Sequence, residues 1–197
     1  MLSIFDGLRS ISLASILLRM VLAVVCGGII GLEREYKRRP AGFRTHILIC
    51  LGAAMTTLTS QYLYLYMHYY TDMARLGAQV VAGIGFIGAG CIIVTRRRRV
   101  KGLTTAAGLW ASACMGLAIG AGFYECVILA FLLMFLCIRL LPYLENYMVE
   151  RARNMNLYIE YTSFDNIGLI IGKIKAQGAQ IYEVNIDRSS ERKGQYP

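Results

Sequence analysis

The chain has 197 residues, of which 56% are hydrophobic and only 17% are charged. Soluble domains usually carry about a quarter charged residues, so this composition excludes a disordered chain and argues against a soluble domain. The net charge of +9 also suits a nucleic-acid binder, but the basic residues cluster between apolar runs, where lipid headgroups and membrane topology explain them equally well. We therefore expect a membrane protein that contacts the lipid bilayer and binds no nucleic acid.

Apolar stretches of about 20 residues are long enough to cross a bilayer as helices. The chain has five of them, at residues 11–32, 45–66, 73–94, 103–122 and 123–141. The last two are contiguous and would together form a helix of about 58 Å, roughly twice the hydrocarbon thickness. They must fold back on each other, and Gly120 to Gly122 supplies the expected turn. The pattern predicts an all-α transmembrane bundle of five helices, in a domain that covers residues 1–144.

The distribution of Lys and Arg predicts the orientation of this bundle. Loops 33–44 and 95–102 hold five basic residues each, whereas segment 61–71 and the turn at Gly120 hold none. Because basic loops stay in the cytoplasm, we expect the N-terminus outside and the C-terminus inside. The tyrosines between residues 62 and 70 then lie at the outer interface.

The chain becomes polar after Leu141, and residues 145–197 form a second predicted segment. Alternating side chains at 156–161 and 180–187 predict strands, and the spacing of isoleucines in 164–177 predicts a helix that stops at Gly178. This cytoplasmic β-α-β segment is too small to be stable alone. A second subunit or a longer chain would complete it.

Small residues are concentrated in the predicted spans. Gly83, Gly85 and Gly88 match GxGxxG, but they lie in the middle of a span, so we do not expect them to bind a nucleotide. In lipid, small residues allow helix backbones to approach closely. The candidate packing or cavity-lining residues are Gly27, Gly31, Gly83, Gly85, Gly88, Gly90, Thr104, Thr105 and Trp110.

The first basic loop also carries acidic residues and a turn. Glu33 and Glu35 at one helix end can pair with Arg39 or Arg44 at the start of the next helix, as an ion-pair latch. A docking surface for a partner protein explains the same residues equally well. The full cluster is Glu33, Arg34, Glu35, Arg39, Pro40, Gly42, Arg44, Thr45 and His46.

Polar residues inside predicted spans are candidate functional residues. They are Arg19, Asp72, Arg75, Gln79 and Glu125, and Arg19 lies about halfway along its span without a neighbour in the sequence to pair with. The sequence shows no nucleophile beside a base, and the six cysteines have no metal-ligand spacing. We expect no enzyme activity, no cofactor, no metal centre and no disulfide.

Four blocks of sequence resemble the MgtC/SapB family of bacterial inner-membrane proteins; they are residues 31–35, 39–46, 79–90 and 101–110. The resemblance implies a multi-pass bundle in the inner membrane and, in many members, a cytoplasmic ACT-like domain, of which residues 156–187 supply about half. It also implies a link to magnesium limitation, to stress adaptation and, in pathogens, to virulence. Some members are regulators that bind the membrane ATP synthase.

We therefore expect a non-enzymatic regulatory membrane protein that binds other membrane proteins and forms a homodimer. The alternative is a transporter or channel for Mg²⁺ or another small solute. A dedicated Mg²⁺ path would carry carboxylates near mid-depth. The acidic residues near the spans instead lie at the predicted boundaries, with Asp72 and Glu125 outside and Glu33, Glu35 and Glu145 inside.

Overall fold

The structure is a computed structural model of the chain, and it describes residues 5–70, 72–94, 100–151, 159, 166–178, 181 and 184. Contacts divide the chain into two compact units, Met1–Arg151 and Ala152–Pro197, and each unit is described by itself. The first unit is mostly helical. Its helices are α1 (Asp6–Arg9), α2 (Leu13–Tyr36), α3 (Phe43–Leu65), α4 (Arg75–Cys91), α5 (Leu103–Ala121) and α6 (Tyr124–Arg151).

Four helices are long and apolar enough to cross a membrane, namely α2, α3, α5 and the Tyr124–Glu145 part of α6. The fifth predicted span, residues 73–94, forms a helix of only 17 residues, from Arg75 to Cys91. Its last residues leave the helix, because Ile93–Val94 (β1) pairs antiparallel with Val100–Lys101 (β2). A multi-pass membrane protein follows from these helices, and the five-span count remains a prediction.

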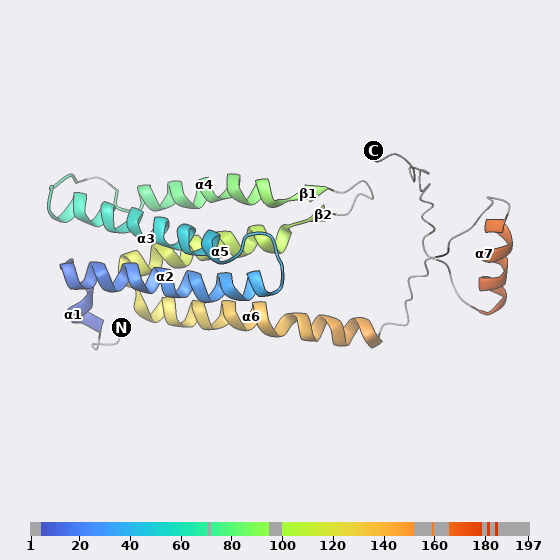
Figure 1. The fold of residues 1–197 in the computed structure, drawn as a ribbon. Coiled ribbons are helices and arrows are strands. Elements are labelled where there is room, and N and C mark those ends of the chain that lie inside the picture. The colour runs from blue at the N-terminus through green and yellow to red at the C-terminus, as the bar shows by residue number, and fades with distance from the viewer. Residues whose placement is uncertain are drawn as a thin grey trace, which may run out of the picture. The chain divides into compact units, whose positions relative to one another are not determined.

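The turn between the last two spans lies where the glycines predict it. Helix α5 ends at Ala121, and Gly122 takes a left-handed conformation with φ of 74°. Only glycine adopts this conformation without steric cost. Helix α6 then begins at Tyr124 and runs back along the bundle (Figure 1).

Helix α3 packs against both α2 and α5, and small residues bring these backbones together. A Cβ on Gly27 would lie 2.8 Å from the carbonyl oxygen of His46 in α3, and one on Gly31 would lie 2.7 Å from the Cα of Phe43. On the other side of α3, a Cβ on Gly116 of α5 would lie 2.8 Å from that of Ala53. Gly27 and Gly31 therefore sit at helix contacts, as the small-residue pattern predicts.

The glycines of α4 behave differently from this expectation. A Cβ on Gly83, Gly85 or Gly90 would meet no atom within 4 Å, so these residues do not pack against another described helix. Of the four glycines predicted to pack in this segment only Gly88 does, with the Cβ of Ala106 in α5 3.4 Å from the added atom. The reason is position: α4 lies at the edge of the bundle, packs mainly on α5 and leaves most of its surface open.

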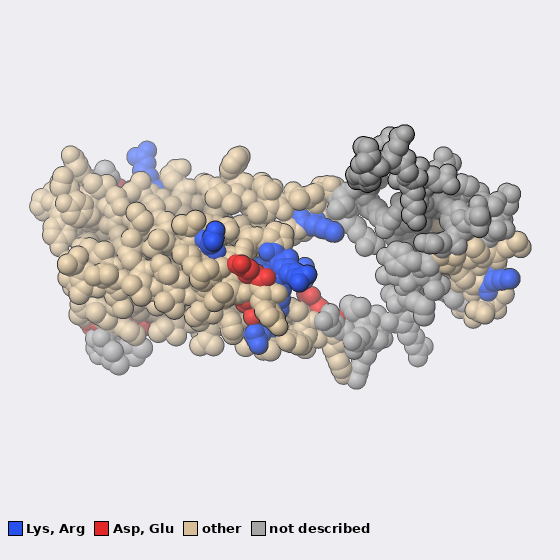
Figure 2. All heavy atoms as spheres, viewed as in Figure 1, with Lys and Arg blue, Asp and Glu red and all other residues tan. Residues whose placement is uncertain are grey.

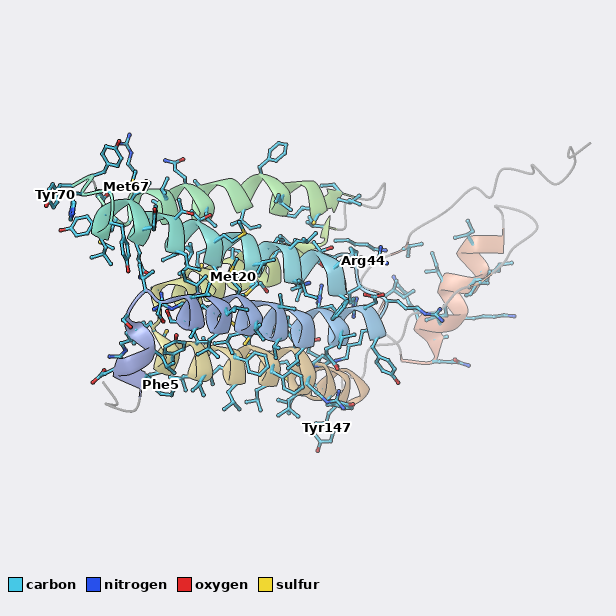
Figure 3. The ribbon with its side chains drawn as sticks, turned by 60° about the vertical axis from the view of Figure 1, so that its left-hand side comes forward. Phe5, Met20, Arg44, Met67, Tyr70 and Tyr147 are labelled. Atoms are coloured by element: carbon cyan, nitrogen blue, oxygen red, sulfur yellow. The ribbon has the colours of Figure 1, made fainter. Side chains whose placement is uncertain are left out.

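The two ends of the bundle differ in chemistry. We call the end with loop 37–42 the basic end and the end with loop 66–74 the tyrosine end. Phe5, Met67 and Tyr70 lie at the tyrosine end, and Arg44 lies at the opposite one (Figure 3). The positive-inside rule uses such a difference in basic residues between the two ends to predict the orientation in the membrane.

We expect the basic end to face the cytoplasm. In a variant without its six cysteines, a single cysteine at Arg38 should react with a membrane-impermeant thiol reagent only after the cells are opened. One at Tyr69 should react in intact cells, since both positions are exposed. Labelling of position 38 in intact cells would reverse the topology.

The described part of the second unit contains helix α7 (Asn166–Ala176). Gly178 follows it with φ of 81°, so both the helix and its glycine stop agree with the prediction. The expected strands at 156–161 and 180–187 lie almost entirely outside the described residues, as do Arg96 to Arg99 of the second basic loop.

Candidate functional site

Glu33 joins two helices at the basic end. Its side chain is only 9% exposed and accepts from Lys37 Nζ at 3.0 Å and from Arg139 Nη1 at 2.8 Å. Lys37 Nζ also donates to the carbonyl of Ile138, at 3.0 Å. The sequence predicts Arg39 or Arg44 as the ion-pair partner of Glu33, and this prediction is wrong. The Glu33 carboxylate faces Arg139 of α6 and Lys37, one turn further along the chain, instead of the loop. The ion pairs therefore tie α2 to α6 and not to α3.

Glu35 caps the following helix. Its Oε2 accepts from the backbone N–H of Phe43, the first residue of α3, at 2.9 Å. Gly42 allows this approach, because a Cβ there would lie 2.8 Å from Glu35 Oε2. The left-handed residues of the loop are Arg38 and Ala41, with φ of 50° and 60°.

Arg34 and His46 point inward from the same cluster. Arg34 is 6% exposed, and its Nη2 donates to Thr105 Oγ1 of α5 at 2.6 Å. His46 is fully buried, and its Nδ1 lies 3.0 Å from the carbonyl oxygen of Gly42. These two residues belong to the interior of the bundle and are not available to a partner protein.

The outward half of the cluster is exposed and basic. Arg38, Arg39, Pro40 and Arg44 are exposed, and they line an open hollow together with Glu35, Gly42, Phe43 and Thr45. Within the described part of the chain, no ion pair involves Arg38, Arg39 or Arg44. On the face of the first unit seen in Figure 2, most charged side chains gather toward this end.

The contact between Glu33 and Arg139 should be measurable as a coupling energy. A double-mutant cycle with Glu33→Gln and Arg139→Gln isolates it from the Glu33–Lys37 pair, which lies within one helix. Arg139 is half exposed, so we expect about 0.5 to 1 kcal/mol of coupling in thermal or denaturant unfolding. A cycle with Lys101→Gln in place of Arg139→Gln should give none. Additive effects of the first pair would show that the contact does not hold α2 to α6.

A second polar centre surrounds Arg19 at the tyrosine end, and the sequence does not show which residues are its partners. Arg19 is fully buried and donates to the carbonyls of Leu8, Arg9 and Gly120, to Gln61 Oε1 and to the Tyr124 hydroxyl, at 2.8 to 3.3 Å. It lies on the second turn of α2, close to the α5–α6 turn, and not halfway along its helix as the sequence predicts. The guanidinium thereby connects α1, α2, α3 and the turn between α5 and α6.

The N-terminal segment closes over this centre. Tyr124 Oη donates to the carbonyl of Leu8 at 3.1 Å, and its ring lies 5.3 Å from that of Phe5. Arg9 pairs with Glu125. Glu125, one of the predicted intramembrane polar residues, is thus part of a network that holds helix α1 in place.

The remaining candidates lie on the surface. Asp72, Arg75, Gln79, Thr104 and Trp110 are exposed, and Asp72 precedes α4 and accepts from the backbone N–H of Ala74 at 2.9 Å. The described side chains contain no group of three His, Cys, Asp or Glu that could share a metal ion.

Comparison of the sequence with known proteins identifies a family. The sequence profile of the MgtC family matches residues 20–147. An uncharacterised protein of Haemophilus influenzae is 36% identical over 87% of this chain and 76% of its own length. SapB of Bacillus subtilis is 33% identical over 90% of the chain and 79% of its own. Escherichia coli K12 YhiD, named as a candidate magnesium transporter, is 44% identical over 57% of the chain and 54% of its own. No solved structure matches the chain.

Proposed function

The chain belongs to the MgtC family, and from that premise we propose that it is a regulatory protein of the bacterial inner membrane which acts by binding other membrane proteins. The observation that carries this proposal is the division of the basic cluster. Its inward residues, Glu33, Arg34 and His46, are engaged within the bundle, whereas Arg39 and Arg44 lie exposed beside an open hollow. A regulator needs a rigid support for a free recognition surface, and this arrangement supplies both.

The chemistry of the hollow suits an acidic segment of a partner. Arg38, Arg39 and Arg44 offer guanidinium groups, which bind carboxylates through paired hydrogen bonds. Pro40 and Phe43 add apolar surface between them. The partner we propose is a membrane protein with a carboxylate-rich cytoplasmic segment; the ATP synthase, which the family resemblance implies for some members, is one candidate. The predicted homodimer remains a prediction, as does the link to magnesium limitation.

Site-specific photo-crosslinking tests this proposal in native membranes. A photoreactive residue at Pro40 should give a discrete protein adduct, because this position is exposed at the hollow. The adduct should disappear when Arg39 and Arg44 are both changed to Glu. Arg75→Glu, at an exposed arginine of the opposite end, is the matched control and should leave it unchanged. Adducts with lipid alone, or a protein adduct that survives the double reversal, would contradict the proposal.

A transporter is the second candidate, and helix α4 is the observation that favours it. Gly83, Gly85 and Gly90 leave its backbone unshielded, and carbonyl oxygens can coordinate a cation. The contacts of three described acidic residues argue against transport. Glu33 pairs with Lys37 and Arg139, Glu35 caps α3, and Glu125 pairs with Arg9, all near the ends of helices. We therefore rank transport below partner binding.

A further inference from the structure

We propose that Arg34, His46 and Thr105, at the basic ends of α2, α3 and α5, form a buried site for a protonated phosphate group. The ligand is inorganic phosphate or the phosphomonoester headgroup of a lipid. This inference is independent of the partner surface, because it uses only the inward residues of the cluster.

Two buried nitrogen atoms without hydrogen-bond partners carry the inference. Arg34 Nε and His46 Nε2 are inaccessible to solvent and have no partner in the structure, although Arg34 is 94% buried and His46 is completely buried. A buried polar group without a partner is strongly unfavourable, and native proteins rarely leave one. Arg19 shows how this bundle treats a buried cation elsewhere, with five acceptors around it.

A small open space, at least the size of a methyl group, lies between Gly108 of α5 and the His46 ring. Gly108 follows Thr105 by one turn on the same face of α5. A Cβ added to Gly108 would have His46 Nε2, at 3.9 Å, as its only neighbour within 4 Å outside the local backbone. The unpartnered nitrogen therefore borders the place where a side chain is missing, and Thr105 brings the Arg34 guanidinium to the same stripe of α5.

The electrostatics of this region favour an anion. Among the described side chains no carboxylate pairs with Arg34, and the side chain that its guanidinium contacts is the neutral Thr105 hydroxyl. Helices α3 and α5 both begin at this end, so the positive ends of two helix dipoles point toward it. Glu35 is used at the first N–H of α3, and α5 has no side-chain cap.

The tautomer of His46 selects among anions. The carbonyl of Gly42 can only accept, so Nδ1 carries the proton of the neutral ring, and Nε2 is an acceptor. A suitable ligand must accept from Arg34 Nε and donate to His46 Nε2. Hydrogen phosphate and phosphomonoesters have both an ionised oxygen and an O–H group, whereas sulfate and phosphodiesters have no proton to donate.

Thermal unfolding of the full chain in neutral detergent tests the site, with phosphate and sulfate compared at equal ionic strength. Phosphate at a hundredfold excess over its dissociation constant should raise the Tm by about 5 °C or more, and sulfate should not. Gly108→Ala should abolish the shift while the ligand-free protein stays as stable, since it fills the space without removing a contact. Arg34→Gln should abolish it too.

Ser112→Ala is the matched control, because Ser112 lies on α5 one turn beyond Gly108 and its buried hydroxyl has no hydrogen-bond partner among the described residues. This variant should keep the phosphate shift.

Lipid nanodiscs separate the two sources of the phosphate group. Stabilisation by phosphatidic acid but not phosphatidylglycerol would assign the site to a lipid monoester, and stabilisation by dissolved phosphate in a phosphatidylcholine disc would assign it to the free ion. Equal effects of phosphate and sulfate, or a shift that survives Gly108→Ala, would overturn the proposal.

Discussion

Replacing Arg19 with methionine should destabilise the bundle by about 3 kcal/mol or more, the cost of leaving several buried hydrogen-bonding groups without partners. Methionine is close to the aliphatic part of arginine in length, so the change removes mainly the guanidinium. The carbonyls of Leu8, Arg9 and Gly120 lose their donor. Because those carbonyls belong to the N-terminal segment and the α5–α6 turn, we expect both to loosen together.

The measurement is thermal unfolding of the purified protein in detergent, where a loss of this size corresponds to about 6 to 12 °C in Tm. Arg75→Met is the matched control: it removes an exposed arginine from the same end of the bundle and should change the Tm little. Arg19→Lys should recover only part of the loss, because an ammonium cannot reach five acceptors in several directions. A Tm of the Arg19→Met protein equal to that of the wild type would show that the network does not hold this end together.

Gly116→Ala and Gly85→Ala should have effects of opposite sign. A Cβ on Gly116 would overlap the carbonyl oxygen of Cys50 and lie 2.8 Å from the Cβ of Ala53, so α3 and α5 would have to separate. Overpacking of this kind costs about 1 to 3 kcal/mol, and more where backbone has to move. Gly85 has open space around it, and there alanine should stabilise the helix by up to about 1 kcal/mol.

The measurement is the Tm of the two variants under the same conditions, and the comparison is direct because the same chemical change is made in two helices. We expect a lower Tm for Gly116→Ala and an equal or higher Tm for Gly85→Ala. If Gly85→Ala were the more damaging of the two, α4 would have to pack against a surface other than α3 and α5, such as a second copy of the chain.

The long helices of the fold are predictable because their signal is local. Apolar runs define α2, α3, α5 and the first part of α6 within a few residues, and the glycines around Gly122 mark the turn. Composition does not distinguish the end of α4 from β1, because Ile92, Ile93 and Val94 suit either structure. Helix α1 has only four residues, too few for a periodic pattern.

The polar centres are less predictable because their partners are distant in sequence. Arg19 bonds to Gln61 and Tyr124, which lie 42 and 105 residues away. An isolated arginine in an apolar span indicates that partners exist but not which they are. Glu33 and Lys37 have the spacing of neighbours on a helix, so their ion pair can be predicted from the sequence. The ion pair of Glu33 with Arg139 cannot, since only the packing of α6 on α2 brings the two residues together.

Mg²⁺ flux into liposomes tests most directly the central claim that the protein binds partners and does not carry the ion. Purified protein is reconstituted into vesicles that contain a magnesium-sensitive dye, with protein-free vesicles as the baseline and an ionophore to show that the dye responds. Glu33, Glu35 and Glu125 are engaged near the helix ends, and Arg19 places a buried cation close to the tyrosine end. We therefore predict influx no faster than in protein-free vesicles. A robust influx that substitutions at Gly83, Gly85 and Gly90 abolish would contradict the account and make transport the function.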